Sequence, residues 1–161
     1  MEIRDAHPDD WAAIWPFFHE IVSAGDTFSY DLDTSEPEAR SMWMLAPPDR
    51  TSVAVVDGVV VGSANMYPNK GGGGAHVASA SFMVSSAATG RGVGRALGED
   101  MLAWARAQGF RAVQFNAVVS SNTRAVGLWK SLGFEVLTTV PEGFHHPTLG
   151  YVGLHIMYQK L

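Results

Sequence analysis

One stretch of the sequence, from Ala75 to Gln108, joins a strand-like run to a glycine-rich turn and then to a helical pattern. The turn and the first helical residues read Thr89-Gly90-Arg91-Gly92-Val93-Gly94-Arg95. This order places unpaired backbone N–H groups at a helix N-terminus, where they can bind a phosphate, and glycine lets a ligand approach the backbone closely. Arg91 and Arg95 lie in the first turn, where the helix dipole disfavours cations unless an anion is nearby. The stretch therefore predicts a phosphate site, although a plain glycine-rich loop before an amphipathic helix is the alternative.

The composition excludes several classes of protein. The 161 residues include no cysteine, so disulfide scaffolds, thiolate metal sites and cysteine nucleophiles are ruled out. Eleven basic against sixteen acidic residues give a net charge of −5, which argues against a nucleic-acid partner. No apolar run approaches the ~20 residues that span a bilayer, and the first residues lack the pattern of a signal peptide. We therefore expect one cytoplasmic domain over residues 1–161, without a membrane or nucleic-acid partner.

Hydrophobic periodicity and turn residues divide the chain into alternating strands and helices. Strands are expected at 2–6, 51–56, 59–67, 75–84, 111–119, 135–140 and 151–161, and helices near 8–24, 35–45, 93–108 and 123–132. The segment 141–150, which is rich in Pro, Gly and His, is expected to be a loop. No internal repeat or second domain is indicated.

Two motifs and this element order resemble the GCN5-related N-acetyltransferase (GNAT) superfamily. The loop motif Thr89-x-x-Gly92-x-Gly94 is similar to the family's Gln/Arg-x-x-Gly-x-Gly/Ala. The second motif, Asn122-x-x-Ala125-x-x-Leu128-Trp129-x-x-x-Gly133-Phe134, is similar to Asn-x-x-Ala-x-x-Leu-Tyr-x-x-x-Gly-Phe. The resemblance covers essentially the whole chain. It implies an α/β fold of the α+β mixed-sheet type, with a mostly antiparallel central sheet of about seven strands and about four helices, splayed at the coenzyme A (CoA) site.

The resemblance also implies that acetyl-CoA is the cosubstrate and that no metal is needed. In the family, the glycine-rich loop binds the pyrophosphate, and the pantetheine arm pairs with the backbone of the strand before the loop. Asn122 would hydrogen-bond the pantetheine arm, would cap its helix, or would do both. The implied cofactor contacts are Phe82, Met83, Val84, Thr89, Gly90, Arg91, Gly92, Val93, Gly94, Arg95 and Asn122.

Trp129 stands where the family usually has a tyrosine that protonates the departing CoA thiolate. Indole N–H donates a hydrogen bond but is not an acid near neutral pH. Because a thiol has a pKa of about 8.5, its thiolate is a tolerable leaving group without a dedicated acid. We therefore expect a branch of the family in which Trp129 packs around the thioester and stabilises the sulfur.

The general base has no clear motif in the sequence. His76 is the only titratable side chain of the strand 75–84, and an imidazole has a suitable pKa. A structural or solvent-exposed His76 is the alternative, and deprotonation through ordered water would leave no motif. His145 and His146 lack a third ligand at a spacing that would suit a metal.

The candidate acceptor-binding residues come from several segments. Asn116 interrupts an apolar strand, so we expect a buried amide that needs partners. The amide either holds a polar group of the acceptor or is satisfied by neighbouring backbone. Phe28 and Tyr30 lie in a loop that borders the acceptor pocket in the family, although Tyr30 could instead cover the core. The remaining candidates are Ser79 and His145.

These observations predict an N-acetyltransferase that acts on a small amine, an amino acid or an amino-acid analogue, by direct attack on the thioester. A peptide or protein N-terminal acetyltransferase and a non-catalytic acyl-CoA-binding module are the alternatives. The sequence leaves open whether the protein is a monomer or a homodimer.

Overall fold

A computed structural model describes all 161 residues and contains a seven-stranded sheet in the order β1-β2-β3-β4-β5-β7-β6. Every neighbouring pair is antiparallel except β4 and β5, which are parallel. The strands are β1 (Glu2–Asp5), β2 (Arg50–Val56), β3 (Val59–Pro68), β4 (Val77–Val84), β5 (Ala112–Val119), β6 (Glu135–His146) and β7 (Gly150–Lys160). The helices are α1 (Trp11–Ala24), α2 (Glu36–Trp43), α3 (Val93–Ala107) and α4 (Thr123–Ser131). The predicted mixed sheet and the four helices are confirmed.

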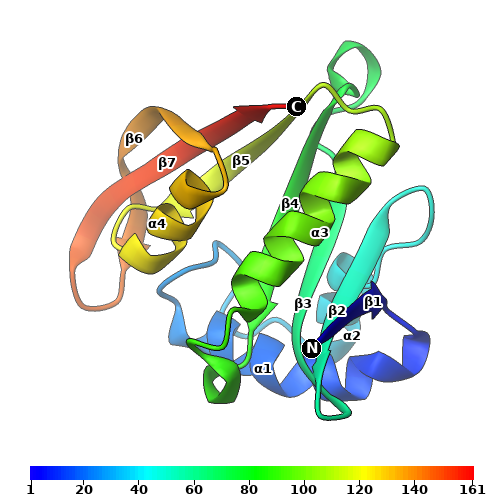
Figure 1. Cartoon of the computed structure of the whole chain (residues 1–161). Coiled ribbons are helices and arrows are strands. Elements are labelled where there is room, and N and C mark those ends of the chain that lie inside the picture. The colour runs from blue at the N-terminus through cyan, green and yellow to red at the C-terminus, as the bar shows by residue number, and fades with distance from the viewer.

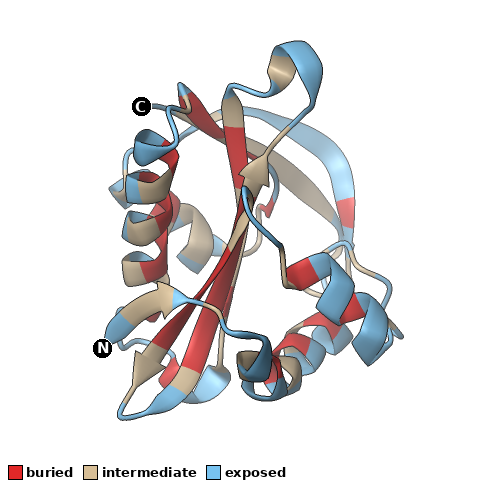
Figure 2. Ribbon diagram, turned by 90° about the vertical axis from the view of Figure 1, so that its right-hand side faces the viewer, coloured by how far each residue is buried: buried red, intermediate tan, exposed pale blue.

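The helices cover both faces of the sheet, so the core has two layers. Figures 1 and 2 show α3 and α4 on one face and α1 and α2 on the other. Under α3 and α4, buried side chains such as Leu97, Met101 and Trp129 form the larger apolar cluster. Under α1 and α2, Phe18 and Trp43 belong to the second cluster. The sheet is thus buried on both sides along its central strands, which is why those strands are rich in apolar residues.

The sheet opens between its two parallel strands. β4 pairs with β5 only at Val77↔Ala112 and Ala78↔Val113, whereas β3 accompanies β4 along its whole length. Beyond those two positions β4 and β5 diverge, as Figure 1 shows for the green and yellow-green strands. The expected splay before the glycine-rich loop is therefore present.

The N-terminal end of α1 is attached to the edge strand β1 by a charged pair. Pro8–Asp10 form a separate 3-10 turn rather than the first turn of the predicted helix. Asp10 accepts two hydrogen bonds from the Arg4 guanidinium, at 2.7 and 2.8 Å, and a third from the His7 N–H at 2.6 Å. The arginine and this backbone bond hold the pKa of the Asp10 carboxyl below its usual range, although partial burial opposes the shift.

The expected loop at 141–150 is wrong. β6 continues to His146, only residues 147–149 form the turn, and β7 begins at Gly150. The register shifts between Val140 and Phe144, where Glu142 has a φ of 52°. The Pro and Gly residues that suggest a loop therefore belong to a bulge within a long hairpin, since bulges use the same residue types as turns.

Candidate active site

The N-terminus of α3 presents three backbone N–H groups without a helical partner. The first helical bond of α3 runs from the N–H of Ala96 to the carbonyl of Gly92 at 3.0 Å, so the amides of Val93, Gly94 and Arg95 remain free. Gly92 is the N-cap in a left-handed conformation (φ 79°), and no side chain caps the helix. These amides face a groove of about 600 Å³ that lies between α1, β4, α3 and α4. The groove therefore offers the features of an anion site.

Most of the predicted cofactor contacts line this groove. They are Phe82, Met83, Val84, Thr89, Gly90, Gly92, Val93, Gly94, Arg95 and Asn122. Arg91 does not line it, because its guanidinium lies 3.6 Å from the carboxylate of Asp57 in the β2–β3 turn. Arg124, in the first turn of α4, lines the groove instead and was not predicted. Its place two residues after Asn122 in the second motif was the available signal.

The backbone of β4 divides its hydrogen bonds between two sides. Ser85 donates to the carbonyl of Val61, and Asn69 donates to the carbonyl of Val77. Backbone N–H and C=O groups point to alternate sides along a strand. Those of the odd-numbered residues of β4 therefore point toward β3, and those of Phe82 and Val84 point into the gap toward β5. Met83, opposite Ser63, is already engaged with β3, so the expectation that its backbone groups are free to pair with the cofactor is wrong, although Met83 lines the groove. Phe82 and Val84 keep groups that a ligand could pair with.

Trp129 lies where the groove meets a second cavity. Its indole is 6% exposed and packs against Phe82 and Phe115, with ring centroids 4.6 and 4.8 Å away. Trp129 and Asn122 line both spaces. The side-chain carbonyl of Asn122 accepts a hydrogen bond from the Ala125 N–H at 3.2 Å, so Asn122 is the N-cap of α4. Both roles considered for Asn122 therefore remain compatible.

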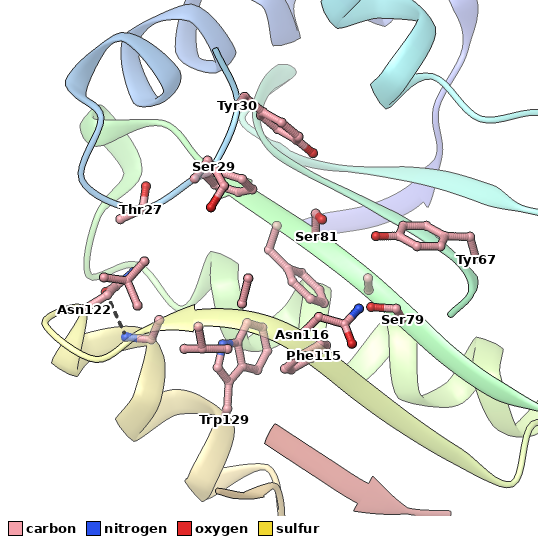
Figure 3. Close-up of a pocket in the computed structure, with 17 residues that line it drawn as sticks. Thr27, Ser29, Tyr30, Tyr67, Ser79, Ser81, Phe115, Asn116, Asn122 and Trp129 are labelled. Carbon is pink, nitrogen blue, oxygen red and sulfur yellow. Dashed lines mark hydrogen bonds between the residues drawn. The ribbon is translucent and has the colours of Figure 1, made fainter. Parts of the chain in front are cut away.

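The second cavity measures about 290 Å³ and passes through the gap between β4 and β5. Figure 3 shows Tyr30 and Ser29 on one side of it, Ser79 and Ser81 on β4, and Trp129 on the opposite side. Four predicted acceptor residues line it, namely Phe28, Tyr30, Ser79 and Asn116. Tyr67 and Ser81 were missed. Their signal was the strand register, because Tyr67 pairs with Ser79 across β3 and β4.

Asn116 is exposed and takes its partners from side chains rather than from backbone. Its amide NH₂ donates to the side-chain oxygen of Asn69 at 2.6 Å, and its oxygen accepts from Gln114 at 3.0 Å. The expectation of a buried amide is therefore wrong, since the divergence of β5 opens this position. Ser79 is buried but shares no hydrogen bond with Asn116.

Tyr30 is both a wall of the cavity and part of the core. Its ring stacks on Phe28 and Phe18, with centroids 5.4 and 5.9 Å away. Burial raises the pKa of the Tyr30 phenol, the nearby phenol of Tyr67 adds to the rise, and Ser81 opposes it. Tyr30 is therefore neutral at physiological pH.

The two predicted histidines lie outside both spaces. His76 precedes β4, and its carbonyl accepts the Arg111 N–H at 2.9 Å. His145 lies in the β6–β7 hairpin and stacks on Tyr151, with ring centroids 4.6 Å apart. Neither imidazole is among the residues that line the groove or the cavity. The structure thus does not bring His76 or His145 to the acceptor.

Comparison with known proteins settles the family. The sequence profile described as "Acetyltransferase (GNAT) family" matches residues 12–134. The chain belongs to the GNAT family of acetyltransferases. The predicted family and enzyme class of this GNAT protein are therefore confirmed.

Solved structures and a curated protein support this assignment. A GCN5-related N-acetyltransferase from Kribbella flavida is 64% identical, with a TM-score of 0.97, and the match covers 99% of this chain and 97% of that one. YncA, a putative acetyltransferase from Salmonella typhimurium solved with its cofactor acetyl-CoA, is 26% identical, with a TM-score of 0.84 over 100% and 94% of the two chains. The N-acetyltransferase Aca1 of Schizosaccharomyces pombe is 25% identical over 133 residues, which are 73% of this chain and 64% of Aca1. This GNAT chain thus spans less than two thirds of Aca1. None of its helices combines the length and apolar character needed to cross a membrane.

Proposed function

We propose that this GNAT protein transfers the acetyl group of acetyl-CoA to a small amine, either an amino acid or an amino-acid analogue, by direct attack on the thioester. One observation carries the proposal. The groove at the N-terminus of α3 and the cavity between β4 and β5 share Phe82, Asn122 and Trp129 at their junction. A cofactor in the groove and an amine in the cavity would therefore meet beside the indole.

The residues of the groove fit CoA. The free amides of Val93, Gly94 and Arg95 would bind the pyrophosphate, and the Arg95 and Arg124 side chains would add positive charge. The free backbone groups of Phe82 and Val84 would pair with the amides of the pantetheine arm. Bound acetyl-CoA supplies an activated acetyl thioester at the junction.

The cavity is suited to a small acceptor, because about 290 Å³ is at the lower end of the range for ligand pockets. Tyr30 and Phe28 would enclose the acceptor, and Ser79, Ser81 and Asn116 would offer hydrogen bonds to its polar groups. Trp129 cannot protonate the thiolate, so the leaving sulfur would take its proton from water. We further propose that residues 1–161 act as one domain.

Two other functions compete with this proposal. Acetylation of a peptide or protein N-terminus would use the same chemistry on a larger acceptor. A module that binds acyl-CoA without turnover would be consistent with Trp129, because an indole is not an acid near neutral pH.

Thiol release from acetyl-CoA, measured with a panel of amines, amino acids, amino-acid analogues and short peptides, separates the three functions. We expect release with small acceptors and acetylated products detected by mass spectrometry. Release with peptides alone would favour N-terminal acetylation. Binding of acetyl-CoA without release on any amine would contradict the enzymatic proposal.

A further inference from the structure

The cavity between β4 and β5 has an uncharged lining. None of its seventeen lining residues is Asp, Glu, Lys, Arg or His. Its only titratable groups are the phenols of Tyr30 and Tyr67, and burial keeps Tyr30 neutral. The cavity therefore contains neither a carboxylate for an ammonium group nor a cation for a carboxylate.

Of the two spaces, only the groove is lined by charged side chains. Glu20 and Asp26 line it from α1 and the segment that follows, and Arg95 and Arg124 line it from α3 and α4. On the β5 side, the groups that contact Asn116 are the neutral amides of Asn69 and Gln114. The histidines at positions 76 and 145 lie elsewhere. Any base for the acceptor would therefore act from the cofactor side of the site.

An uncharged cavity discriminates among acceptors by their charge. Moving an unpaired ammonium or carboxylate out of water is costly, and neither would find an opposite charge here. Neutral donors are available instead, since hydroxyl and amide groups of Tyr67, Ser79, Ser81 and Asn116 line the cavity. Such donors match a neutral carbonyl group.

We infer that the preferred acceptor of this site is an α-amine of low basicity beside a neutral carbonyl group, as in an amino-acid amide or ester. This inference rests on the proposed acetyl transfer and narrows its substrate class. An α-amine next to a peptide carbonyl has a pKa of about 7.7–8.0, so roughly a tenth of it is neutral at pH 7. An alkylamine with a pKa of about 10.4 is only roughly 0.04% neutral at that pH.

The reaction then needs no ionisable side chain in the cavity. The neutral amine nitrogen forms a bond to the carbonyl carbon of the thioester, and the carbon–sulfur bond breaks. The nitrogen loses one proton to water, and CoA leaves as a thiolate that accepts a proton from water. The products are the N-acetylated amide or ester and free CoA.

Three acceptors with the same side chain test the inference: an amino-acid amide, the amino alcohol in which a CH₂OH group replaces the amide, and the free amino acid. The side chain is the one that gives the fastest thiol release among a panel of amino-acid amides. We expect kcat/KM at pH 7 to be at least about tenfold higher for the amide than for the other two. Between pH 6 and 9, the profile of the amide should bend at the pKa of its own free amine, whereas the profiles of the amino alcohol and the free amino acid, whose amines are more basic, should still be rising at pH 9.

The matched variant Asn116→Asp puts a carboxylate into the cavity with almost no change of shape. Because Asn116 is exposed, the variant should fold. We expect it to reduce the preference for the amide over the amino alcohol severalfold, since the new charge attracts an ammonium group. An unchanged preference would overturn the inference.

Asp26→Asn and Glu20→Gln test for a base on the cofactor side. Whatever the effect of each variant on the rate, we expect its pH–rate profile with the amide to bend at the same pH as the profile of the wild-type protein. A displaced bend in either variant, one common bend for all three acceptors, or a preference for the free amino acid would overturn the inference. Absence of thiol release with every acceptor would contradict the proposed acetyl transfer itself, and this inference would fall with it.

Discussion

At the scale of single residues, Trp129 has a packing role that is visible in the structure and a chemical role that is proposed. It contacts Phe82 and Phe115, and its ring also approaches Phe134 at 6.1 Å. A smaller aromatic residue would leave part of this space empty, and a cavity in a core is destabilising. Packing and catalysis can therefore be separated by comparing two smaller rings that differ by one hydroxyl.

We expect Trp129→Tyr and Trp129→Phe to remain folded and to lose about 1–2 kcal/mol of stability, which is roughly 2–8 °C in Tm. The tyrosine variant should keep or exceed the wild-type kcat, because its phenol can protonate the thiolate, and the phenylalanine variant should be slower. Thermal unfolding and thiol release provide the two readouts. Inactivation of both variants with acetyl-CoA still bound would show that the indole itself has a specific role.

Asp10 gives a second prediction at this scale, because its carboxylate joins the edge strand to the turn before α1. Its folded-state pKa is lowered, so the interaction stabilises the protein above the unfolded pKa of about 3.9 and is lost as the pH falls through the folded value. Asp10→Asn should therefore cost about 1 kcal/mol at pH 7, and the cost should become smaller as the pH falls below about 3.9.

Asp9→Asn is the matched control, since the Asp9 side chain lies in the same turn but is 92% exposed. It should change the free energy of unfolding by less than about 0.5 kcal/mol at either pH. Urea titrations at pH 7 and pH 3 measure both variants. An Asp10→Asn effect that is equal at the two pH values would be inconsistent with the proposed electrostatic origin.

At the scale of elements, β4 is a strand with one satisfied edge and one edge that is free for most of its length. Beyond the two positions that β4 shares with β5, the backbone N–H and C=O groups of its even-numbered residues point into the gap. Side-chain substitution tests these groups poorly, because the proposed contact is made by the main chain. Amide hydrogen exchange measures the main chain directly.

Without ligand, we expect the amide hydrogens of Phe82 and Val84 to exchange faster than that of Met83, which faces β3. Saturating acetyl-CoA should slow Phe82 and Val84 and leave Met83 nearly unchanged. Exchange resolved at single residues by NMR distinguishes the three. Equal protection of all three in the free protein would contradict the backbone directions described above.

The two ends of α3 allow a controlled test of the phosphate site. Gly92 at its start and Gly109 just after its end both have a φ of 79°, and at neither glycine would an added Cβ have a neighbouring atom within 4 Å. Gly92→Glu and Gly109→Glu should therefore suffer a similar conformational penalty of about 1–2 kcal/mol.

Only Gly92→Glu should lose CoA affinity, by about 100-fold or more, because it brings bulk and negative charge to the free amides of α3. Isothermal titration calorimetry with CoA measures the difference. Equal affinities for the two variants would refute the assignment of this loop to the pyrophosphate.

At the scale of the whole molecule, the local signals were sufficient for most of the fold and for the groove at the N-terminus of α3. The strands, the helices and the loop around Gly92 follow from periodicity and turn residues that lie close together in the sequence. The continuation of β6 beyond Val140 was missed because Pro141 and Gly143 occupy a bulge, and a bulge looks like a turn in sequence.

The cavity between β4 and β5 was harder to predict, because it is assembled from segments that are distant in sequence. Tyr67 joins it only through the register of β3 on β4, and Asn116 is exposed only because β5 diverges. The side chains of His145 and Arg91 are of types that could bind an acceptor or a phosphate. In the structure, however, His145 stacks on Tyr151 and Arg91 pairs with Asp57. Residue type alone does not contain that tertiary information.

The splay also has a consequence for the stability of the molecule as a whole. Since β4 and β5 share only two paired positions, a ligand between them would connect the two parts of the sheet. Acetyl-CoA at about 100 times its Kd should raise the free energy of unfolding by about 2.7 kcal/mol. Calorimetry should show one transition at a higher Tm, and no shift at a concentration that saturates binding would contradict this coupling.

The alternation along β4 separates two requirements that a transferase must meet. In the proposed arrangement, the even-numbered residues Phe82 and Val84 hold the cofactor through their backbone, whereas Ser79 and Ser81 present side chains to the acceptor. A mutation at an odd position can therefore alter the choice of acceptor while the cofactor contacts persist. Such a strand can acquire new substrates in single steps, because each intermediate sequence still binds the acetyl donor.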